Sequence, residues 1–381
     1  MKFLIAPDSF KGSLTAKQVA QSIYRGIVKI FPRAEYELIP MADGGEGTVQ
    51  SLIDATHGKK IACRVHGPLN TFVDAEYGIL GDSRTAVIEM AQASGIQYVT
   101  STTRDPLKAT TYGTGELILD ALDQGVSKII LGIGGSATND GGAGMAQALG
   151  IKLLKKDNVP ISLGGGGLRA LDHIDITGLD PRLAETEILI ASDVTNPLTG
   201  KNGASAVFGP QKGADSVMIA SLDSNLHHYA KIIARDLHKS VETIPGAGAA
   251  GGLGAGLLAF THSKMKKGID LVIEYSGLLK KAQAVDFCLT GEGKIDFQTK
   301  FGKTPFGVAK AVKSISPEAI VIAIAGNVGD DLGELYGSTY FDAIFSDLTG
   351  VKDLRTAFED APHDLEITSE NIARMIQAIK K

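Results

Sequence analysis

The chain begins with the stretch MKFLIAPDSFKGS, residues 1–13, and this stretch decides how the rest of the sequence is interpreted. Residues 2–6 (KFLIA) form a short apolar run that is typical of a buried strand. Asp8 and Lys11 follow it, three residues apart, at the expected carboxyl end of that strand. In open α/β sheets this edge is where ligands bind. The carboxylate can hold a metal or a substrate hydroxyl, and the ammonium can hold a phosphate or a small carboxylate.

The pattern after the first strand predicts a doubly wound α/β sheet. Thr15 and Gln18 fit a capping box, and apolar residues then recur at helical spacing over residues 16–30. A strand over 37–40 and a helix over 48–56 repeat the unit. The last third of the chain resumes this rhythm with strands at 285–290, 319–325 and 342–346, a helix start at Thr304-Pro305 and a C-terminal helix from about residue 369.

The middle of the chain has a different pattern from about residue 64. Short strands over 72–80 and 85–90 indicate an antiparallel or mixed sheet. The other expected elements there are helices at 114–123, 140–149 and 217–237 and strands at 127–133 and 187–192. A length of 381 residues also favours two domains. We therefore expect one domain built from residues 1–65 and 285–381, a second inserted at 66–284, and an active site in the cleft between them.

Composition excludes several classes of protein. A net charge of −5 without a Lys/Arg block argues against a nucleic-acid surface. The longest apolar run, residues 319–325, is too short to span a membrane, and residues 2–6 are too short for a signal peptide. The two cysteines, Cys63 and Cys288, have no metal-ligand spacing, and such scarce cysteine fits a reducing cytoplasm. We expect a soluble, cytoplasmic protein without nucleic-acid or membrane partners.

Several glycine-rich turns that carry acids follow the predicted strands. Glycine there permits close approach of a ligand, and amides at a helix N-terminus bind anions. Phosphoryl transfer needs such anion sites, carboxylates for Mg²⁺ and a group that orients the acceptor hydroxyl. The four turns lie at residues 43–47, 132–144, 193–203 and 291–303.

Known nucleotide motifs fit poorly. Residues 302–304 resemble the end of a Walker A loop, but Phe297 stands where its first glycine belongs. Residues 132–137 fit G-x-G-x-x-A and residues 246–251 fit G-x-G-x-x-G, although no strong strand precedes the second. A tight turn or a close helix contact explains each match more simply than a dinucleotide site.

The acids and lysines have structural interpretations as well. Asp43 and Asp140 precede helices and could be N-caps. Asp193 lies in a turn after a buried strand, so a functional role and a structural role are about equally supported by its position. The same holds for Lys212. The histidines at 57, 66, 227, 228 and 262 lack ligand spacing and are expected at the surface. Residues alone thus indicate a two-domain α/β enzyme acting on a small anionic, phosphorylated ligand.

In order along the chain, these loops closely resemble the type 1 glycerate kinase family. Eight loops in a fixed order are far more specific than one glycine-rich match. They are APDSFKGSL (6–14), PMADGGEGT (40–48), GTGELI (113–118), GIGGSATNDGGAG (132–144), DVTNPL (193–198), FGPQKGA (208–214), PGAGAAGGLG (245–254) and TGEGKID (290–296) with Gly302-Lys303.

The resemblance implies ATP-dependent phosphorylation of D-glycerate on its 2-hydroxyl, giving 2-phosphoglycerate, with Mg²⁺, in glyoxylate or sugar-acid catabolism. It also implies two unlike α/β domains, a flavodoxin-like (Rossmann-like) three-layer domain and an inserted, restriction-endonuclease-like mixed α/β domain. D-Glycerate and ATP are the expected partners, and a homo-oligomer is possible.

On this basis each polar loop residue receives an expected role. Asp193 is the first choice for the group that orients or deprotonates the hydroxyl, and Asp8 is the second, with Lys11 beside it in the catalytic set. Substrate binding is assigned to Lys11, Ser9, Asn139, Asn196 and Lys294. Metal binding is assigned to Glu292, Asp296 and Asp43. Cofactor binding is assigned to Gly44, Gly45, Gly134, Gly135, Ser136, Lys212, Gly291, Gly293 and Lys303.

Three alternatives remain at this stage. Phosphate could go to the 3-hydroxyl, because pocket geometry decides between two neighbouring oxygens. An NAD-dependent hydroxy-acid oxidoreductase is supported only by the runs at 132–137 and 246–251. A non-catalytic anion-binding protein is the third, but it would have no use for so many acids at strand ends.

Overall fold

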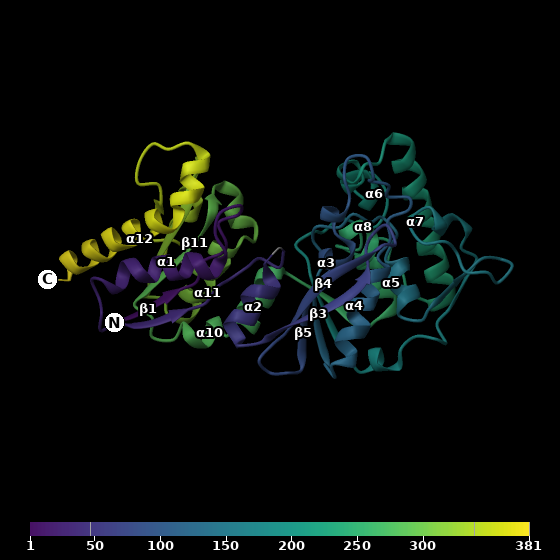
Figure 1. Ribbon diagram of the computed structural model, residues 1–381, viewed down its shortest axis with the longest axis horizontal. Coiled ribbons are helices and arrows are strands. Elements are labelled where there is room, and N and C mark those ends of the chain that lie inside the picture. The colour runs from purple at the N-terminus through teal and green to yellow at the C-terminus, as the bar shows by residue number, and fades with distance from the viewer. Residues whose placement is uncertain (46, 339, 381) are drawn as a thin grey trace. The chain divides into compact units, whose positions relative to one another are not determined.

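A computed structural model describes residues 1–45, 47–338 and 340–380. The chain folds into two compact units (Figure 1). Unit 1 contains residues 1–58 and 267–381, and unit 2 contains residues 59–266. Both chain ends therefore belong to unit 1.

Unit 1 is built on a five-stranded parallel sheet with the order β13-β12-β11-β1-β2. Counted along the chain within this unit, that is the order 2-1-3-4-5 of flavodoxin-like sheets, whose ligand crevice lies where the first and third strands adjoin. Here that switch point lies between β1 and β11. The strands are β1 (Lys2–Ile5), β2 (Glu35–Leu38), β11 (Phe287–Ile295), β12 (Ile320–Val328) and β13 (Ala343–Ser346).

Helices cover both faces of this sheet. On one face α1 (Ala16–Val28) and α12 (Leu354–Ile379) lie side by side over Phe3, Ile5 and Leu289 (Figure 1). The strand residues between these, such as Leu4 and Cys288, are equally buried on the opposite face. Two-sided burial explains why these strands read as continuous apolar runs. The other helices of the unit are α2 (Thr48–Thr56), α9 (Gly268–Tyr275), α10 (Leu278–Lys281) and α11 (Thr304–Ile315).

The two ends of this chain pack unusually closely at Gly26 of α1. A Cβ at this position would lie 2.3 Å from the main-chain oxygen of Glu366 and 2.8 Å from the Ser369 Cβ. Glycine is required here for close helix approach rather than for a turn. The predicted capping box is confirmed, since the Thr15 side chain accepts from the Gln18 amide and the Gln18 side chain accepts from the Thr15 amide.

The prediction that the last helix begins near residue 369 is wrong. Helix α12 begins at Leu354, where the Asp353 side chain caps the Thr356 amide, and it continues through Pro362. A helical proline has no N–H for the carbonyl four residues earlier, which here belongs to Phe358. The Ser13 hydroxyl donates to that carbonyl instead, at 2.9 Å. This bond fixes the loop after β1 against the start of α12.

Unit 2 contains a mixed six-stranded sheet with the order β10-β9-β6-β5-β4-β3. Its β3, β4 and β5 pair antiparallel, as predicted for this region, and β5, β6, β9 and β10 run parallel. The strands are β3 (Lys59–His66), β4 (Phe72–Ile79), β5 (Thr85–Glu89), β6 (Lys128–Gly132), β9 (Glu187–Ala191) and β10 (Ser263–Lys266). A small antiparallel sheet is formed by β7 (Lys152–Leu154) and β8 (His173–Asp175).

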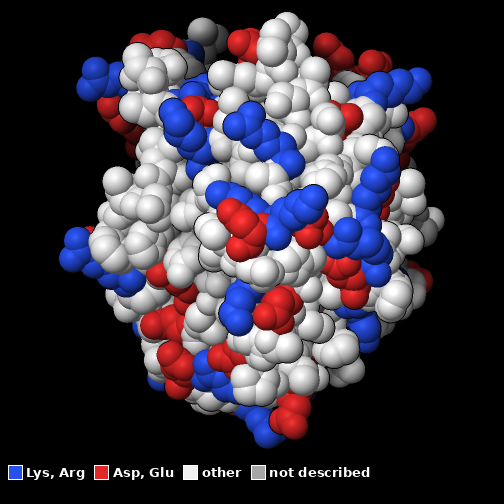
Figure 2. All heavy atoms as spheres, turned by 90° about the vertical axis from the view of Figure 1, so that its right-hand side faces the viewer, with Lys and Arg blue, Asp and Glu red and all other residues white. Residues whose placement is uncertain are grey.

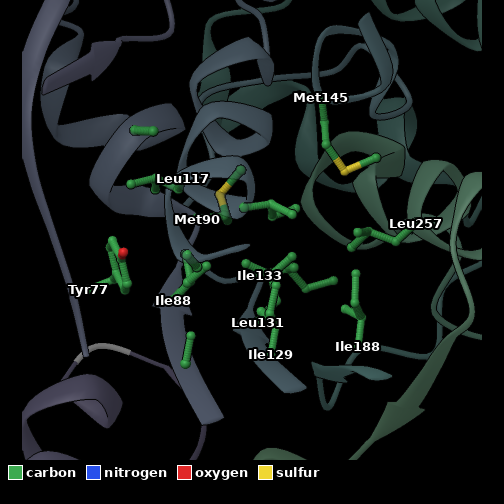
Figure 3. Packing of buried hydrophobic residues seen from close by; sticks show 14 of the residues in the cluster. Tyr77, Ile88, Met90, Leu117, Ile129, Leu131, Ile133, Met145, Ile188 and Leu257 are labelled. Atoms are coloured by element: carbon green, nitrogen blue, oxygen red, sulfur yellow. The ribbon is translucent and has the colours of Figure 1, made fainter. Parts of the chain in front are cut away.

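The helices of unit 2 bury two apolar clusters. One cluster lies where Ile88, Leu131 and Ile188 of the sheet meet Leu117 and Leu257 (Figure 3). The second centres on Tyr229 and Phe260. The helices are α3 (Ala91–Ser94), α4 (Tyr112–Asp123), α5 (Ala143–Ala148), α6 (Ala204–Phe208), α7 (Ser216–Leu237) and α8 (Ala249–Phe260).

The unit boundaries differ from the predicted domain limits at 65/66 and 284/285. Residues 59–66 form β3, which pairs with β4 along its whole length and so belongs to unit 2. Residues 267–281 form α9 and α10, which contact α11 of unit 1. Periodicity identifies an element but cannot say which sheet it joins. A likeness of unit 2 to restriction endonucleases stays a prediction.

Candidate active site

A cavity of about 990 Å³ lies within unit 1 at the carboxyl edge of its sheet. Its walls come from the loop after β1, the end of β11, the first turn of α1 and the segment between β13 and α12. Strand order brings these segments together, because Asp8 donates its amide to Gly291 of β11 at 2.8 Å. The cavity thus occupies the switch point at which this fold class binds ligands.

Asp8 lies in this cavity at the position that the opening stretch predicts. Its carboxylate accepts hydrogen bonds from the Thr304 hydroxyl and, at 2.6 Å, from the Ser9 amide. Burial raises the pKa of Asp8 to about 6, the Thr304 bond opposes that rise, and the charge of Asp43 adds to it. A carboxyl group with a pKa near 6 is ionised at neutral pH and can accept a proton.

Glu292 and Lys303 lie in the same cavity. The Glu292 carboxylate accepts from the Thr299 hydroxyl at 3.1 Å and lies 3.4 Å from the Lys303 ammonium. Burial raises the pKa of Glu292 to about 7, although Lys303 opposes it, and the charge of Asp8 adds to the rise. The like charge of Asp8 makes Glu292 a carboxylate whose ionised form a bound cation would stabilise.

The other two predicted metal ligands have different surroundings. Asp296 caps a short 3-10 helix, accepting from the Gln298 amide at 3.0 Å, and it lies 3.0 Å from the Lys294 ammonium. These partners lower the pKa of Asp296, and they favour a structural role. Asp43 is exposed, lines the cavity and accepts from the Gly45 amide at 3.0 Å. It is not the N-cap of α2, because Gly47 occupies that position.

The predicted cofactor glycines of unit 1 separate into two groups. Gly293 lines the cavity. Gly291 is buried inside the sheet, where a Cβ would lie 2.0 Å from the Ile324 carbonyl oxygen, so close strand packing accounts for it. Gly44 is buried next to Gly268 and Gly45 binds the side chain of Asp43. Glu46, in the same motif, lies outside the described residues.

Of the predicted substrate ligands, Ser9, Lys11 and Lys294 all line the cavity. Lys11 and Lys294 are exposed, and Ser9 is half-buried. Their cations and hydroxyl therefore lie at the same edge as Asp8 and Glu292, where the Ser9 hydroxyl donates to Asp8 at 3.2 Å. Together with Lys303 at the N-cap of α11, which has no side-chain cap, they provide an environment for anions.

Sequence reasoning missed a further acid in this cavity. Asp347 directly follows β13 and is only 2% exposed, yet its Oδ1 atom has no hydrogen-bond partner. Burial raises the pKa of Asp347 to about 7, and Asp364 adds to the rise. Lys352 lies 2.6 Å from Asp364 and lines the same wall. The rule that found Asp8, an acid just after a buried strand, would also have found Asp347.

Unit 2 holds a separate buried polar cluster around Asp140. This carboxylate is fully buried and accepts from the Thr111 amide at 2.8 Å, the Gly142 amide at 3.1 Å and the Gly144 amide at 3.2 Å. Burial raises the pKa of Asp140 although these donors oppose it. The N-cap of α5 is Gly142, so Asp140 organises the turn from two residues earlier.

Lys212 and Ser136, both predicted to bind the cofactor, are hydrogen-bonded to each other. The buried Lys212 ammonium donates to the Ser136 hydroxyl at 2.7 Å and to the Thr138 carbonyl at 2.6 Å. Burial lowers the pKa of Lys212 to about 7, against the charge of Asp140. These bonds join the loop after α6 to the loop after β6. Cofactor contact by either side chain stays a prediction.

The other predicted residues of unit 2 differ in exposure. Asp193 is exposed just beyond β9, as are Gly134 and Gly135 beyond β6. Asn139 is buried, with its amide nitrogen donating to Ser205 at 2.9 Å and its Oδ1 atom without a partner. Asn196 donates to the Asn202 carbonyl at 2.8 Å. Their roles stay predictions.

The glycine run at 246–251 serves packing. No strand of the described residues leads into it, and Ala250, Gly251 and Gly252 adopt left-handed backbone angles inside α8. A Cβ on Gly251 would lie 2.0 Å from the Thr138 carbonyl oxygen. Close contact with the loop after β6 therefore explains this run without a dinucleotide.

The surface carries mixed charge on the face that Figure 2 shows, where Lys and Arg side chains lie among Asp and Glu side chains. Within the described ranges, none of the helices combines the length and apolar character needed to cross a bilayer.

The polar cavity of unit 1 is the candidate site with the clearest chemistry, because it combines near-neutral carboxyls, a lysine and a helix N-terminus.

Comparisons with known proteins agree with this chemistry. A sequence model of the glycerate kinase family matches residues 3–377. The chain is 52% identical over 373 residues to the glycerate 2-kinase of Escherichia coli K12, covering 98% of this chain and 97% of that one. It is 52% identical over 370 residues to a glycerate kinase of Halalkalibacterium halodurans, covering 97% of each.

A solved structure supports the fold over the whole chain. This crystal structure, of a protein assigned as glycerate kinase 2 from Salmonella typhimurium LT2, matches with a TM-score of 0.92 at 49% identity. It covers 100% of this chain and 99% of its own. The mixed α/β fold class predicted from the sequence is thereby confirmed, and the chain belongs to the glycerate kinase family of phosphotransferases.

Proposed function

We propose that this protein phosphorylates the 2-hydroxyl of D-glycerate with ATP, giving 2-phosphoglycerate and ADP. The regiochemistry rests on the relative named glycerate 2-kinase, at 52% identity. The observation that carries the chemistry is the grouping of Asp8, Glu292 and Lys303 in one cavity at the sheet's switch point. The expectation that residues of both units form one active site stays a prediction.

Asp8 is the group best suited to accept the proton. Its carboxylate is held by Thr304 and Ser9 and is mostly ionised above pH 6. As the hydroxyl proton moves to Asp8, the glycerate oxygen forms a bond to the γ-phosphorus. The bond from that phosphorus to the bridging oxygen of ADP breaks, and ADP leaves with the electron pair. Lys303 and the N-terminus of α11 offset the charge of the transferring group.

The residues present fit Mg²⁺. Among the residues that the structure describes, no three acidic, histidine or cysteine side chains form a complete metal site. Mg²⁺ in kinases usually takes one or two carboxylates and completes its shell with phosphate oxygens and water. Glu292, whose pKa is raised by burial and by the charge of Asp8, is the carboxylate that would hold it. The ion would neutralise charge on the phosphates.

The assignment of the base changes as a consequence. Asp193 is exposed, whereas Asp8 is half-buried in the same cavity as Glu292, and burial raises its pKa. We therefore place Asp8 first. Ser9, Lys11 and Lys294, which line the same cavity, remain our candidates for the glycerate carboxylate and hydroxyls, with Asn139 and Asn196 as predictions.

The experiment is to incubate the protein with D-glycerate, ATP and Mg²⁺ and to identify the product by phosphorus NMR. We expect 2-phosphoglycerate, and 3-phosphoglycerate would overturn the regiochemistry. Asp8→Asn and Asp193→Asn form a matched pair of variants. A general base contributes about 10²- to 10⁴-fold, so Asp8→Asn should lower kcat within that range and Asp193→Asn much less. The reverse ranking would restore Asp193 as the base.

From the family we also expect a cytoplasmic location, a place in glyoxylate or sugar-acid catabolism and a homo-oligomeric state. Titration with NADH tests the oxidoreductase alternative, for which we expect no change in cofactor fluorescence.

A further inference from the structure

The cavity of unit 1 is much larger than glycerate requires. Its volume of about 990 Å³ lies at the upper end of the range of about 300–1,000 Å³ for pockets that take drug-sized ligands. Asp8, Glu292 and Lys303 occupy one part, around the ends of β1 and β11. The rest extends past β12 to the segment that joins β13 to α12, and the phosphoryl-transfer chemistry does not use that part.

Sheet register gives the separation of the two parts. Glu292 lies beside Ala325 on β12, and Ala325 lies beside Ser346 at the end of β13. The next residue, Asp347, donates its amide to the Ala325 carbonyl at 3.0 Å. Two strand spacings of about 4.8 Å therefore place Asp347 roughly 10 Å from Glu292. Gly293 and Gly326 line the cavity and keep this stretch of wall free of side chains.

The far part of the cavity has an aromatic and aliphatic wall. It is lined by Phe358, Leu354 and Ala357 from the first turns of α12, together with Leu14. Phe358 is 41% exposed and Leu354 is 71% exposed. The Phe358 ring lies 3.3 Å from the place a Cβ would take on Gly12, and Ser13 holds its carbonyl. The ring is therefore fixed by the loop after β1 with part of its surface open.

A single buried acceptor lies beside this wall. Asp347 lines the cavity at 2% exposure, and its Oδ1 atom is without a partner. A buried polar atom without a partner costs about 1–3 kcal/mol, so a ligand that donates a hydrogen bond there gains from it. The exocyclic amine of adenine is such a donor, whereas guanine has a carbonyl oxygen in the corresponding position.

We propose that this far part of the cavity is the nucleobase subsite, in which Phe358 and Leu354 contact the face of the adenine ring and Asp347 accepts from its amine. The ribose then lies over Gly293 and Gly326, and the triphosphate extends to Glu292 and Lys303. This inference rests on the proposed function, because it deepens the same site by naming what selects ATP.

The first test is calorimetric binding of ADP with Mg²⁺ to Phe358→Ala. Stacking on an aromatic side chain contributes enough that its removal should weaken ADP binding roughly 5- to 150-fold. Inorganic tripolyphosphate, which has no base, should bind the variant and the parent protein equally. The matched control is Phe301→Ala, a 71% exposed phenylalanine of the same unit, whose ring contacts Lys300. It should bind ADP normally.

The second test changes base selectivity without removing volume. Asp347→Asn can turn an N–H₂ donor toward the guanine carbonyl, so the ratio of kcat/KM for ATP to that for GTP should fall at least tenfold. A role confined to folding would lower both values alike. Unchanged ADP affinity in Phe358→Ala, or a higher KM for glycerate alone, would overturn the subsite. Failure of the parent protein to form ADP from ATP and glycerate would instead overturn the proposed function.

Discussion

Thr304→Val removes the one hydroxyl that donates to Asp8 from α11 while keeping the side-chain volume. Thr304 is buried, and its bond is the largest influence that holds the pKa of Asp8 down against burial. Because a hydrogen bond to a charged group contributes about 1.5–3 kcal/mol, and 1.36 kcal/mol corresponds to one pKa unit, we expect the pKa of Asp8 to rise from about 6 to about 7 or higher.

The expected effect on rate follows from the ionised fraction of Asp8. At pH 6.5 a group with a pKa near 6 is about three-quarters ionised, and one with a pKa near 7 is about one-quarter ionised. At pH 6.5 the variant should therefore run at about one-quarter of its own plateau, against about three-quarters for the parent protein, with the acid limb of its profile moved to higher pH. The charge of Asp43 also raises the pKa of Asp8, and Asp8 in turn raises the pKa of Glu292.

The assay is kcat/KM between pH 5 and pH 9 with both substrates below saturation, so that the profile reports the free enzyme. Thr261→Val is the control, since this buried threonine of unit 2 donates to the Leu257 carbonyl and loses the same hydroxyl. It should leave the profile in place. An acid limb that stays or moves to lower pH in Thr304→Val would refute the assignment of Asp8 as the proton acceptor.

Three further variants test other parts of the structure. Gly26→Ala should lower the free energy of unfolding by about 1–3 kcal/mol in urea denaturation, because its Cβ would lie 2.3 Å from a main-chain oxygen of α12; unchanged stability would mean that the helices separate freely. Lys212 binds its proton less tightly in the folded than in the unfolded protein. The free energy of unfolding should therefore rise by roughly 3 kcal/mol from pH 7 to pH 9.5, and Lys212→Met should flatten that rise. Glu292→Gln should raise the Mg²⁺ concentration needed for half-maximal rate at least tenfold, and chelation by EDTA should stop the parent enzyme reversibly; an unchanged Mg²⁺ requirement would exclude Glu292 as a ligand.

Much of unit 1 follows from local sequence. Apolar runs of the right length predict the strands at 2–6, 285–290 and 319–325, and the acid after the first of them predicts Asp8 at the ligand edge. The capping box at Thr15 is equally local. What strand length cannot provide is strand order, and strand order is what places Glu292 next to Asp8, which is 284 positions earlier.

The errors arise where tertiary contacts override local signals. The last helix begins at Leu354 rather than near residue 369, and Ser13 satisfies the carbonyl that Pro362 leaves unpaired within it. Local sequence likewise cannot show that the Lys212 ammonium is buried and donates to Ser136 and Thr138, although its predicted contact with the cofactor is untested. In both cases the deciding partner lies far away in the sequence, where no periodicity can indicate it.

The near-neutral pKa of Asp8 results from two opposing effects that the fold supplies together. A carboxylate left in water would ionise readily and accept a proton only weakly. One buried without a donor would be protonated at neutral pH and could accept none. The switch point buries Asp8 between β1 and β11, and the same arrangement brings the first residue of α11 close enough to donate a hydrogen bond. A change to either effect should therefore impair catalysis, by weakening the base or by keeping it protonated.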